Sequence, residues 1–140
     1  MHYALKLAER ARQADAVPVG AIVLSADGDV VSEGWNTLRG PLDHAECVAI
    51  DLAVKKLGSN KLRGCTIYTT LEPCIMCAGA ILNAQIDKVV FGAWDTRFGA
   101  SGSVWDLLRD PRAAHHPEVF GGVLDEECSK ILTDFFEELR

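Results

Sequence analysis

Strand-like and helix-like segments alternate along this chain, and the alternation restricts the folds that it can adopt. Short apolar runs bounded by turn residues indicate strands, whereas apolar residues three and four positions apart indicate helices. Strands that alternate with helices predict a layered α/β sandwich. The expected order is an N-terminal helix ending before Pro18, strands at 19–24 and 30–35, a helix at 44–57, a strand at 65–70, a helix opening at Pro73, strands at 88–92 and 119–123, and a last helix capped by Asp125.

The connection between the first two strands determines the type of sheet. Asp27 and Gly28 form a tight-turn signal in a connection that is too short for a crossover helix. The strands at 19–24 and 30–35 are therefore expected to pair antiparallel, while strands separated by a helix can run parallel. The sequence thus predicts a mixed sheet.

Composition limits the size, location and partners of the protein. With 140 residues, of which 49% are hydrophobic and 24% charged, the chain is expected to form a single domain over residues 1–140. No apolar run is long enough to cross a bilayer and the N-terminus carries no export signal, so we expect a cytoplasmic protein without membrane contact. The formal net charge of -6 excludes a general attraction to nucleic acid, so any polyanion site must be a local patch.

Residues that can bind a metal stand at two of the expected strand-to-helix junctions, where α/β folds place their sites. Cys74 and Cys77 are three positions apart at the start of a helix, so both sulfur atoms point the same way, and His44 can supply a third ligand. The alternative is a pair of buried thiols, because cysteine is often buried. A zinc ion with two Cys and one His keeps an open position for water, so this set predicts a hydrolytic zinc site.

Two interpretations of Glu46 stay open from the sequence. Glu46 lies two residues after His44, where a carboxylate can accept a proton from a water that two thiolates leave only weakly acidified. Alternatively, Glu46 has a structural role: with Asp43 as N-cap and Glu46 at the third helical position, the two residues form a variant of the capping box.

The pattern H-x-E at 44–46 followed by P-C-x-x-C at 73–77 resembles the signature of zinc-dependent nucleobase deaminases. The likeness extends over nearly the whole chain to the bacterial tRNA adenosine deaminases of the cytidine deaminase-like family, through the segments VPVGAIV, SEGWN, HAE, TLEPCIMCAGAI, VVFGAWD, GASGS and LTDFF. The resemblance implies a three-layer α/β/α sandwich with a mixed central sheet of about five strands. It also implies a homodimer with one Zn²⁺ per subunit, in which water attacks C6 of the wobble adenosine of a tRNA anticodon stem-loop and inosine is formed.

The same resemblance assigns roles to individual residues. His44, Cys74 and Cys77 are implied to hold the zinc, and Glu46 to move protons between water, base and leaving group. The residues implied to contact the substrate are Asn36, Ala45, Pro73, Asp95, Arg97 and Phe135.

Two features depart from the usual pattern of that family. The connection 37–43 is shorter, and the last helix ends in Glu137 and Glu138 where a basic cluster is common. Together with the net charge, they leave a second function open, the deamination of a free base or nucleoside such as guanine, cytosine or adenosine. A third possibility is a zinc module without catalytic activity. The salt dependence of activity distinguishes deamination of tRNA from deamination of a free base, because binding through phosphates weakens steeply with rising salt concentration.

The remaining polar and apolar residues receive simpler expectations. Glu72 is expected to orient the turn before Pro73. The expected phosphate contacts are Arg39, Lys61, Arg63 and Arg97; core positions are expected for Cys47, Cys65 and Cys128; a surface loop is expected for His115 and His116; and a core-facing stripe is expected for Cys128, Ile131, Leu132, Phe135, Phe136 and Leu139.

Overall fold

A five-stranded mixed sheet is the centre of the computed structural model, which describes residues 1–140. The strands lie in the order β2-β1-β3-β4-β5. β1 pairs antiparallel with both β2 and β3, and the β3-β4 and β4-β5 pairs are parallel. The mixed sheet and its initial hairpin are therefore as expected. The strands are β1 (Gly20–Leu24), β2 (Val30–Trp35), β3 (Thr66–Leu71), β4 (Lys88–Ala93) and β5 (Glu118–Phe120).

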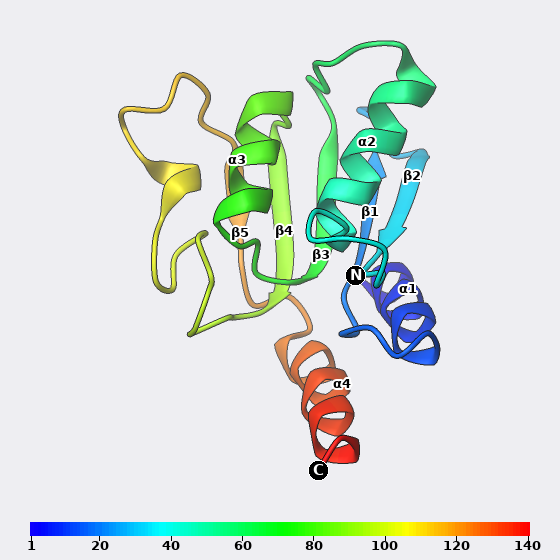
Figure 1. The fold of residues 1–140 in the computed structure, drawn as a ribbon. Coiled ribbons are helices and arrows are strands. Elements are labelled where there is room, and N and C mark those ends of the chain that lie inside the picture. Colours follow the sequence, from blue (N-terminus) through cyan, green and yellow to red (C-terminus); the bar gives the residue numbers. More distant parts are fainter.

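Four α-helices and one short 3-10 helix pack around this sheet. They are α1 (His2–Gln13), α2 (Ala45–Leu57), α3 (Ile75–Ala84), the 3-10 helix η1 (Leu107–Arg109) and α4 (Asp125–Glu138). Figure 1 shows α2 and α3 side by side over the sheet, while α4 packs against β4 and its neighbour β3. None of the helices combines the length and the apolar character needed to cross a membrane.

Two glycines show that α1 and α2 cover opposite faces of the sheet. A Cβ atom on Gly20 would lie 2.1 Å from the Ala4 carbonyl oxygen of α1, and one on Gly34 would lie 2.3 Å from the Ala45 carbonyl oxygen of α2. Gly34 pairs with Ala21, the neighbour of Gly20, and adjacent residues of a strand face opposite sides. The three-layer α/β/α sandwich is therefore confirmed.

Small side chains bring α2 close to the sheet. Ala45, Ala49 and Ala53 recur on one face of α2 and are fully buried against the core that contains Ile67 of β3 and Val89 of β4. Because the helix lies so close, the residues at its N-terminus stand directly over the ends of the central strands.

The structure corrects the expected starts of α2 and α3. The N-cap of α2 is His44, not Asp43, whose carboxylate instead accepts a hydrogen bond of 3.0 Å from the Thr37 hydroxyl. α3 begins at Ile75 with Cys74 as N-cap, so Pro73 precedes the helix. Both N-caps are extended residues, which is the usual backbone conformation at that position.

The last helix also differs from expectation. Leu124 is its N-cap and Asp125 its first helical residue, with the Asp125 carboxylate accepting a 3.0 Å hydrogen bond from the Ser129 hydroxyl. Cys128 and Phe135 are buried, but Phe136 is 50% and Leu139 is 68% exposed. The apolar stripe is therefore only partly covered, and β5 is likewise shorter than the expected 119–123.

Candidate metal centre and active site

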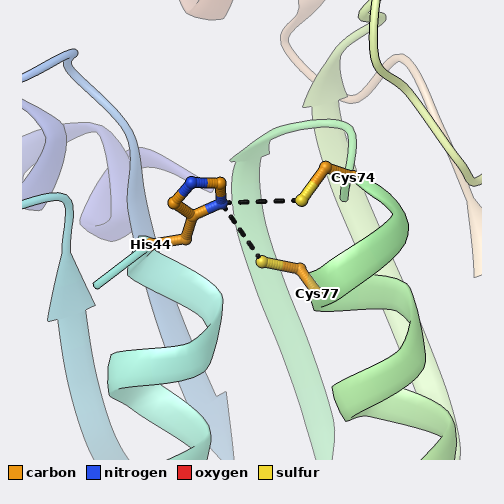
Figure 2. Close-up of side chains that lie close together, drawn as sticks. All are labelled: His44, Cys74 and Cys77. Atoms are coloured by element: carbon orange, nitrogen blue, oxygen red, sulfur yellow. Dashed lines mark hydrogen bonds between the residues drawn. The ribbon is translucent and has the colours of Figure 1, made fainter. Parts of the chain in front are cut away.

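Three potential metal ligands converge from the N-termini of α2 and α3. His44 Nδ1 lies 3.5 Å from Cys74 Sγ and 3.6 Å from Cys77 Sγ, as Figure 2 shows. The donor atoms of these three residues all lie within 4.8 Å of one another. The two cysteine sulfurs therefore point the same way, as their spacing predicted, and His44 reaches them from the N-terminus of the neighbouring helix.

The separations between the ligand atoms fit a zinc ion. Zinc–sulfur and zinc–nitrogen bonds of about 2.3 and 2.0 Å at a tetrahedral angle place sulfur and nitrogen about 3.5 Å apart. The distances from His44 Nδ1 to Cys74 Sγ and Cys77 Sγ agree with this value. Two thiolates and one imidazole leave one tetrahedral position for a ligand from solution, which is the arrangement of catalytic zinc sites.

The three ligands differ in protonation: the lowered pKa of Cys74 favours metal binding, whereas hydrogen bonds with Cys47 and Cys74 raise the pKa of Cys77, and both Cys77 and His44 must release a proton to bind a metal. Hydrogen bonds from Cys77 and His44 lower the pKa of Cys74 to about 4, and the hydrogen bond with Cys74 raises the pKa of His44. One sulfur is therefore already a thiolate at neutral pH, the form in which cysteine binds metals.

Glu46 is buried beside this group, with 4% of its surface exposed. The Thr69 hydroxyl donates a 2.9 Å hydrogen bond to Glu46 Oε1, and the Cys77 thiol donates one of 3.2 Å to Oε2. Burial raises the pKa of the Glu46 carboxyl. The N-cap is His44, and the Asp43 backbone N–H donates to the Gly40 carbonyl and not to Glu46, so the capping-box interpretation is wrong. The carboxylate is held next to the metal ligands instead.

A cavity of about 690 Å³ opens over these residues, and its size is typical of small-molecule sites. His44, Glu46 and Cys74 lie in its wall. Its remaining lining combines aromatic side chains with a few polar ones and includes Asn36, Glu72, Trp94, Asp95, Arg97, Phe98, Trp105 and Phe136.

Asn36 joins this cavity to the start of α2. Its Oδ1 accepts a 2.8 Å hydrogen bond from the Ala45 backbone N–H, and its own backbone N–H donates to the Val19 carbonyl at 3.1 Å. The side-chain amide nitrogen makes no hydrogen bond within the chain, so it is available as a donor to a molecule in the cavity.

Of the six residues expected to contact substrate, Asn36, Asp95 and Arg97 line the cavity, and the other three do not. Ala45 is fully buried and its N–H is already bonded to Asn36. Pro73 is buried, and its carbonyl accepts a hydrogen bond from Ala100. Phe135 turns into the fold with 6% exposure.

Phe136 takes the place expected for Phe135. It lies in the cavity lining and is 50% exposed. Adjacent residues of a helix point about 100° apart, so only one of the pair can face the cavity. The sequence contains both phenylalanines and gives no sign of which one that is.

Cys47 lies close to the metal ligands, although the sequence suggested a core position. Its sulfur is 3.7 Å from Cys77 Sγ and it is half-buried, whereas Cys65 and Cys128 are buried as expected. The sequence feature that could have shown this is the spacing of the two residues, because Cys47 follows His44 by three positions and so lies on the same side of the helix.

Comparisons with known proteins agree with this site. The sequence profile of the cytidine and deoxycytidylate deaminase zinc-binding region matches residues 1–93. The chain is 46% identical over 143 aligned residues to the tRNA-specific adenosine deaminase of Bacillus subtilis, an alignment that covers 100% of this chain and 88% of that protein.

Two solved structures are similar in fold. One, from work on A-to-I editing by tRNA:A34 deaminases at the wobble position of transfer RNA, superposes with a TM-score of 0.90 and 38% identity over 94% of this chain and 97% of that one. The other, a guanine deaminase from Nitrosomonas europaea, gives a TM-score of 0.83 and 26% identity over 96% of this chain and 81% of that one.

Proposed function

This chain belongs to the cytidine and deoxycytidylate deaminase zinc-binding family, and from that membership we propose that it deaminates the wobble adenosine of a tRNA anticodon loop to inosine. The reaction is a hydrolysis in which adenosine and water give inosine and ammonia. The observation that carries the proposal is the convergence of His44, Cys74 and Cys77 beside the buried Glu46, in the wall of a cavity lined by aromatic residues.

His44, Cys74 and Cys77 would hold one Zn²⁺ in each chain. When bound, zinc supplies Lewis-acid activation of a water molecule. Glu46 would accept a proton from the attacking water and return protons to the base and to the departing amino group, since its Oε2 lies 3.2 Å from Cys77 Sγ.

The cavity wall binds and orients the base. The free amide nitrogen of Asn36 can donate a hydrogen bond to the ring, and Trp94, Phe98 and Phe136 offer flat apolar surfaces for stacking. A base can enter such a cavity only when it is outside a stacked duplex, as in a loop.

Among the four candidate phosphate contacts, Arg97 is the one that lines this cavity. Lys61 and Arg63 instead bond to Asn83 and Gln85 at the far end of α3 from Cys74. We therefore propose Asp95 and Arg97 as the RNA-facing pair on the cavity rim.

We further propose that residues 1–140 form one deaminase domain, that the protein is a homodimer, and that it acts in the cytoplasm, where tRNA is processed. Support for the dimer comes from apolar side chains on the α2 side of the site. Leu42 and Leu52 are 66% and 45% exposed and line a second cavity of about 680 Å³ with Trp35 and Met76. Such surface favours contact with another protein copy.

The experiment that tests the function uses a transcribed anticodon stem-loop with adenosine at the wobble position and a matched stem-loop with adenosine moved one position along the loop. Zinc-loaded protein is expected to form inosine in the first and not in the second. Inosine in neither stem-loop would overturn the proposal.

A second candidate function is deamination of a free base. The similarity to the guanine deaminase of Nitrosomonas europaea favours it, although the identity is lower than to the tRNA enzymes. Turnover of guanine, cytosine or adenosine without turnover of the stem-loop would select this alternative.

A further inference from the structure

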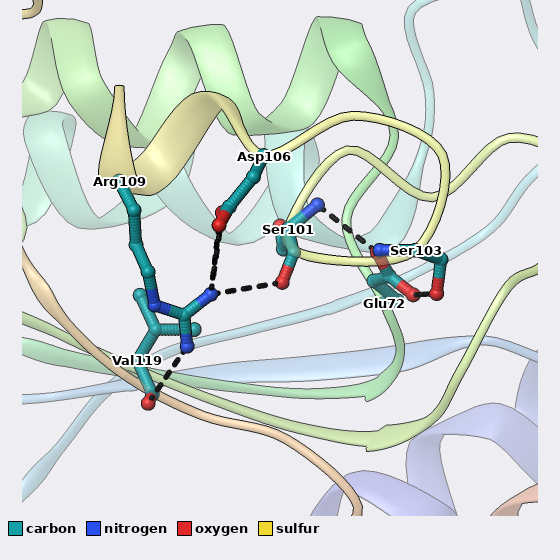
Figure 3. Close-up of polar contacts among 6 residues, drawn as sticks. All are labelled: Glu72, Ser101, Ser103, Asp106, Arg109 and Val119. Atoms are coloured by element: carbon teal, nitrogen blue, oxygen red, sulfur yellow. Dashed lines mark hydrogen bonds and ion pairs between the residues drawn. The ribbon is translucent and has the colours of Figure 1, made fainter. Parts of the chain in front are cut away.

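Glu72 is a buried carboxylate to which the proposed mechanism gives no role. It follows the end of β3, precedes Cys74 by two residues, and is 2% exposed. The backbone N–H of Asp95 donates to its Oε1 at 3.0 Å, and the backbone N–H groups of Ser101 and Ser103 each donate to its Oε2 at 3.0 Å. The Ser103 hydroxyl also donates to Oε1, as Figure 3 shows. Both oxygens therefore act only as acceptors.

The donors belong to one loop, residues 94–105, that borders the cavity. Trp94, Asp95, Arg97, Phe98 and Trp105 of this loop are in the cavity lining. The loop contains no α-helix or β-strand, so no regular hydrogen-bond ladder holds it in place. Three of its backbone N–H groups are bonded to a single buried side chain instead.

The same loop also contacts the two residues that follow Glu72 in the sequence, Pro73 and Cys74. The Ala100 N–H donates to the Pro73 carbonyl at 2.8 Å, and Gly99 forms an isolated bridge with Cys74. Gly99 is packed so closely that a Cβ atom there would lie 2.4 Å from the Glu72 carboxyl group. The segment 72–74 thus connects the cavity loop directly to a metal ligand.

Arg109 supports the loop from its outer side, but weakly. Its guanidinium donates to the Ser101 carbonyl at 3.4 Å, to Asp106 Oδ1 at 3.2 Å and to the Val119 carbonyl at 3.4 Å, and its side chain is 47% exposed (Figure 3). Long, exposed bonds contribute less than short buried ones. Glu72 therefore holds the loop more firmly than Arg109 does.

We propose that Glu72 is a positioning residue that fixes residues 94–98 relative to Cys74 and so determines how tightly the substrate binds. The inference rests on the proposed function for the identity of the substrate, but not for the structural role of the carboxylate. Both oxygens of Glu72 are bonded to donors of the loop and neither to a metal-ligand side chain, so loss of the carboxylate should weaken substrate binding and leave the ligand set intact.

The test is Glu72→Gln, compared with Glu118→Gln, which makes the same chemical change at an exposed position of β5. An amide nitrogen donates where the carboxylate accepted, so at least one backbone N–H of the loop loses its acceptor. Three readouts are measured: zinc per chain, KM and kcat on the stem-loop, and amide hydrogen exchange of the segment 94–103.

For Glu72→Gln we expect one zinc per chain, a fall in kcat/KM of about ten- to a hundredfold carried mainly by KM, and faster exchange in 94–103 with β3 and β4 unchanged. Ser103→Ala, which removes only the hydroxyl donor, should give a smaller change in the same direction. Glu118→Gln should behave as the unchanged protein.

Gly99→Ala is the second variant, and it keeps the carboxylate while forcing it and the loop apart. It should reproduce the higher KM and the faster local exchange, which keeps the inference testable if Glu72→Gln fails to fold. Unchanged KM and unchanged exchange, or loss of zinc in proportion to activity, would overturn the role assigned to Glu72. If the unaltered protein makes no inosine, the proposed function fails, and the exchange comparison, which needs no substrate, still decides the role of Glu72.

Discussion

Asn36 Oδ1 accepts a 2.8 Å hydrogen bond from the backbone N–H of Ala45, so the residue proposed to read the base also holds the start of the helix that carries Glu46. The N-cap of that helix, His44, has no side-chain capping bond of its own. The Asn36 amide therefore satisfies one of the N–H groups that every helix leaves free at its N-terminus. Substrate recognition and the geometry of the metal centre are connected through one side chain.

Two substitutions of Asn36 separate these roles. Asn36→Asp keeps the oxygen that accepts from Ala45 and loses the amide donor, so KM should rise about tenfold while the thermal midpoint stays close to that of the unaltered protein. Asn36→Ala loses both contacts and should cost about 1 kcal/mol of unfolding free energy as well. Steady-state kinetics and thermal unfolding check both, and equal kinetics for Asn36→Asp and the unaltered protein would remove the donor role.

Replacing Glu46 should separate zinc binding from catalysis. Glu46→Gln keeps the shape of the side chain but removes the proton acceptor, so kcat should fall by about a hundredfold to ten-thousandfold while one zinc per chain remains. Metal analysis and inosine formation are measured on the same sample. Glu126→Gln, an exposed carboxylate at the start of α4, is the control. A fully active Glu46→Gln would contradict the proton-shuttle role.

The metal ligands should be distinguishable from the nearby Cys47. Cys77→Ser replaces a thiolate ligand, so zinc content should fall well below one per chain and activity should be lost. Cys47→Ser removes a sulfur that lies 3.7 Å from Cys77 Sγ but is not in the ligand group, so zinc should stay at one per chain. Chelation of the unaltered protein should abolish turnover and added zinc should restore it. Full zinc in Cys77→Ser would show that the assigned ligand set is wrong.

Salt should affect the reaction on RNA through Arg97. Because phosphate contacts release counterions, kcat/KM on the stem-loop should fall steeply with salt, and Arg97→Ala should flatten the dependence of log kcat/KM on log salt by about 0.7, the effect of one single-strand phosphate contact. Arg63→Ala is the matched control, since that guanidinium bonds to Gln85 away from the cavity. An identical slope for Arg97→Ala and the unaltered protein would place the phosphate contacts elsewhere.

Two glycines offer a matched test of the packing between α2 and the sheet. A Cβ atom on Gly34 would lie 2.3 Å from the Ala45 carbonyl oxygen, whereas one on Gly79, on the exposed face of α3, would meet nothing within 4 Å. Gly34→Ala should lower the unfolding free energy by about 1–3 kcal/mol or more, and Gly79→Ala should raise it by up to about 1 kcal/mol. Chemical denaturation measures both, and a neutral Gly34→Ala would contradict the close approach of α2.

The sequence could predict the features that depend on the spacing of residues close together in the chain. The hairpin followed from the short turn at Asp27 and Gly28, and the ligand group followed from the three-residue spacing of Cys74 and Cys77 at a strand-to-helix junction. These relationships depend on residues near one another in the chain or on the general rule that sites in α/β folds lie at such junctions.

The features that the sequence could not predict depend on contacts between segments that are far apart in the chain. Helical periodicity shows that Phe136 and Leu139 share a face of α4, but not how far the sheet extends beneath it, so their exposure was missed. Glu72 holds the loop only because the chain after Trp94 returns to the segment that follows β3, and that loop has no periodic pattern from which such a path could be predicted. Likewise, the exclusion of Ala45 from the cavity depends on the bond that Asn36 makes across nine residues.

The tRNA deaminase activity is tested by comparing kcat/KM for the wobble-adenosine stem-loop with kcat/KM for guanine, cytosine and adenosine, on a single preparation in which zinc has been counted. We expect about one zinc per chain and inosine at the wobble position, with no turnover of the free bases or nucleoside. A zinc-loaded protein that deaminates a free base and leaves the stem-loop unchanged would show that the protein is not a tRNA deaminase.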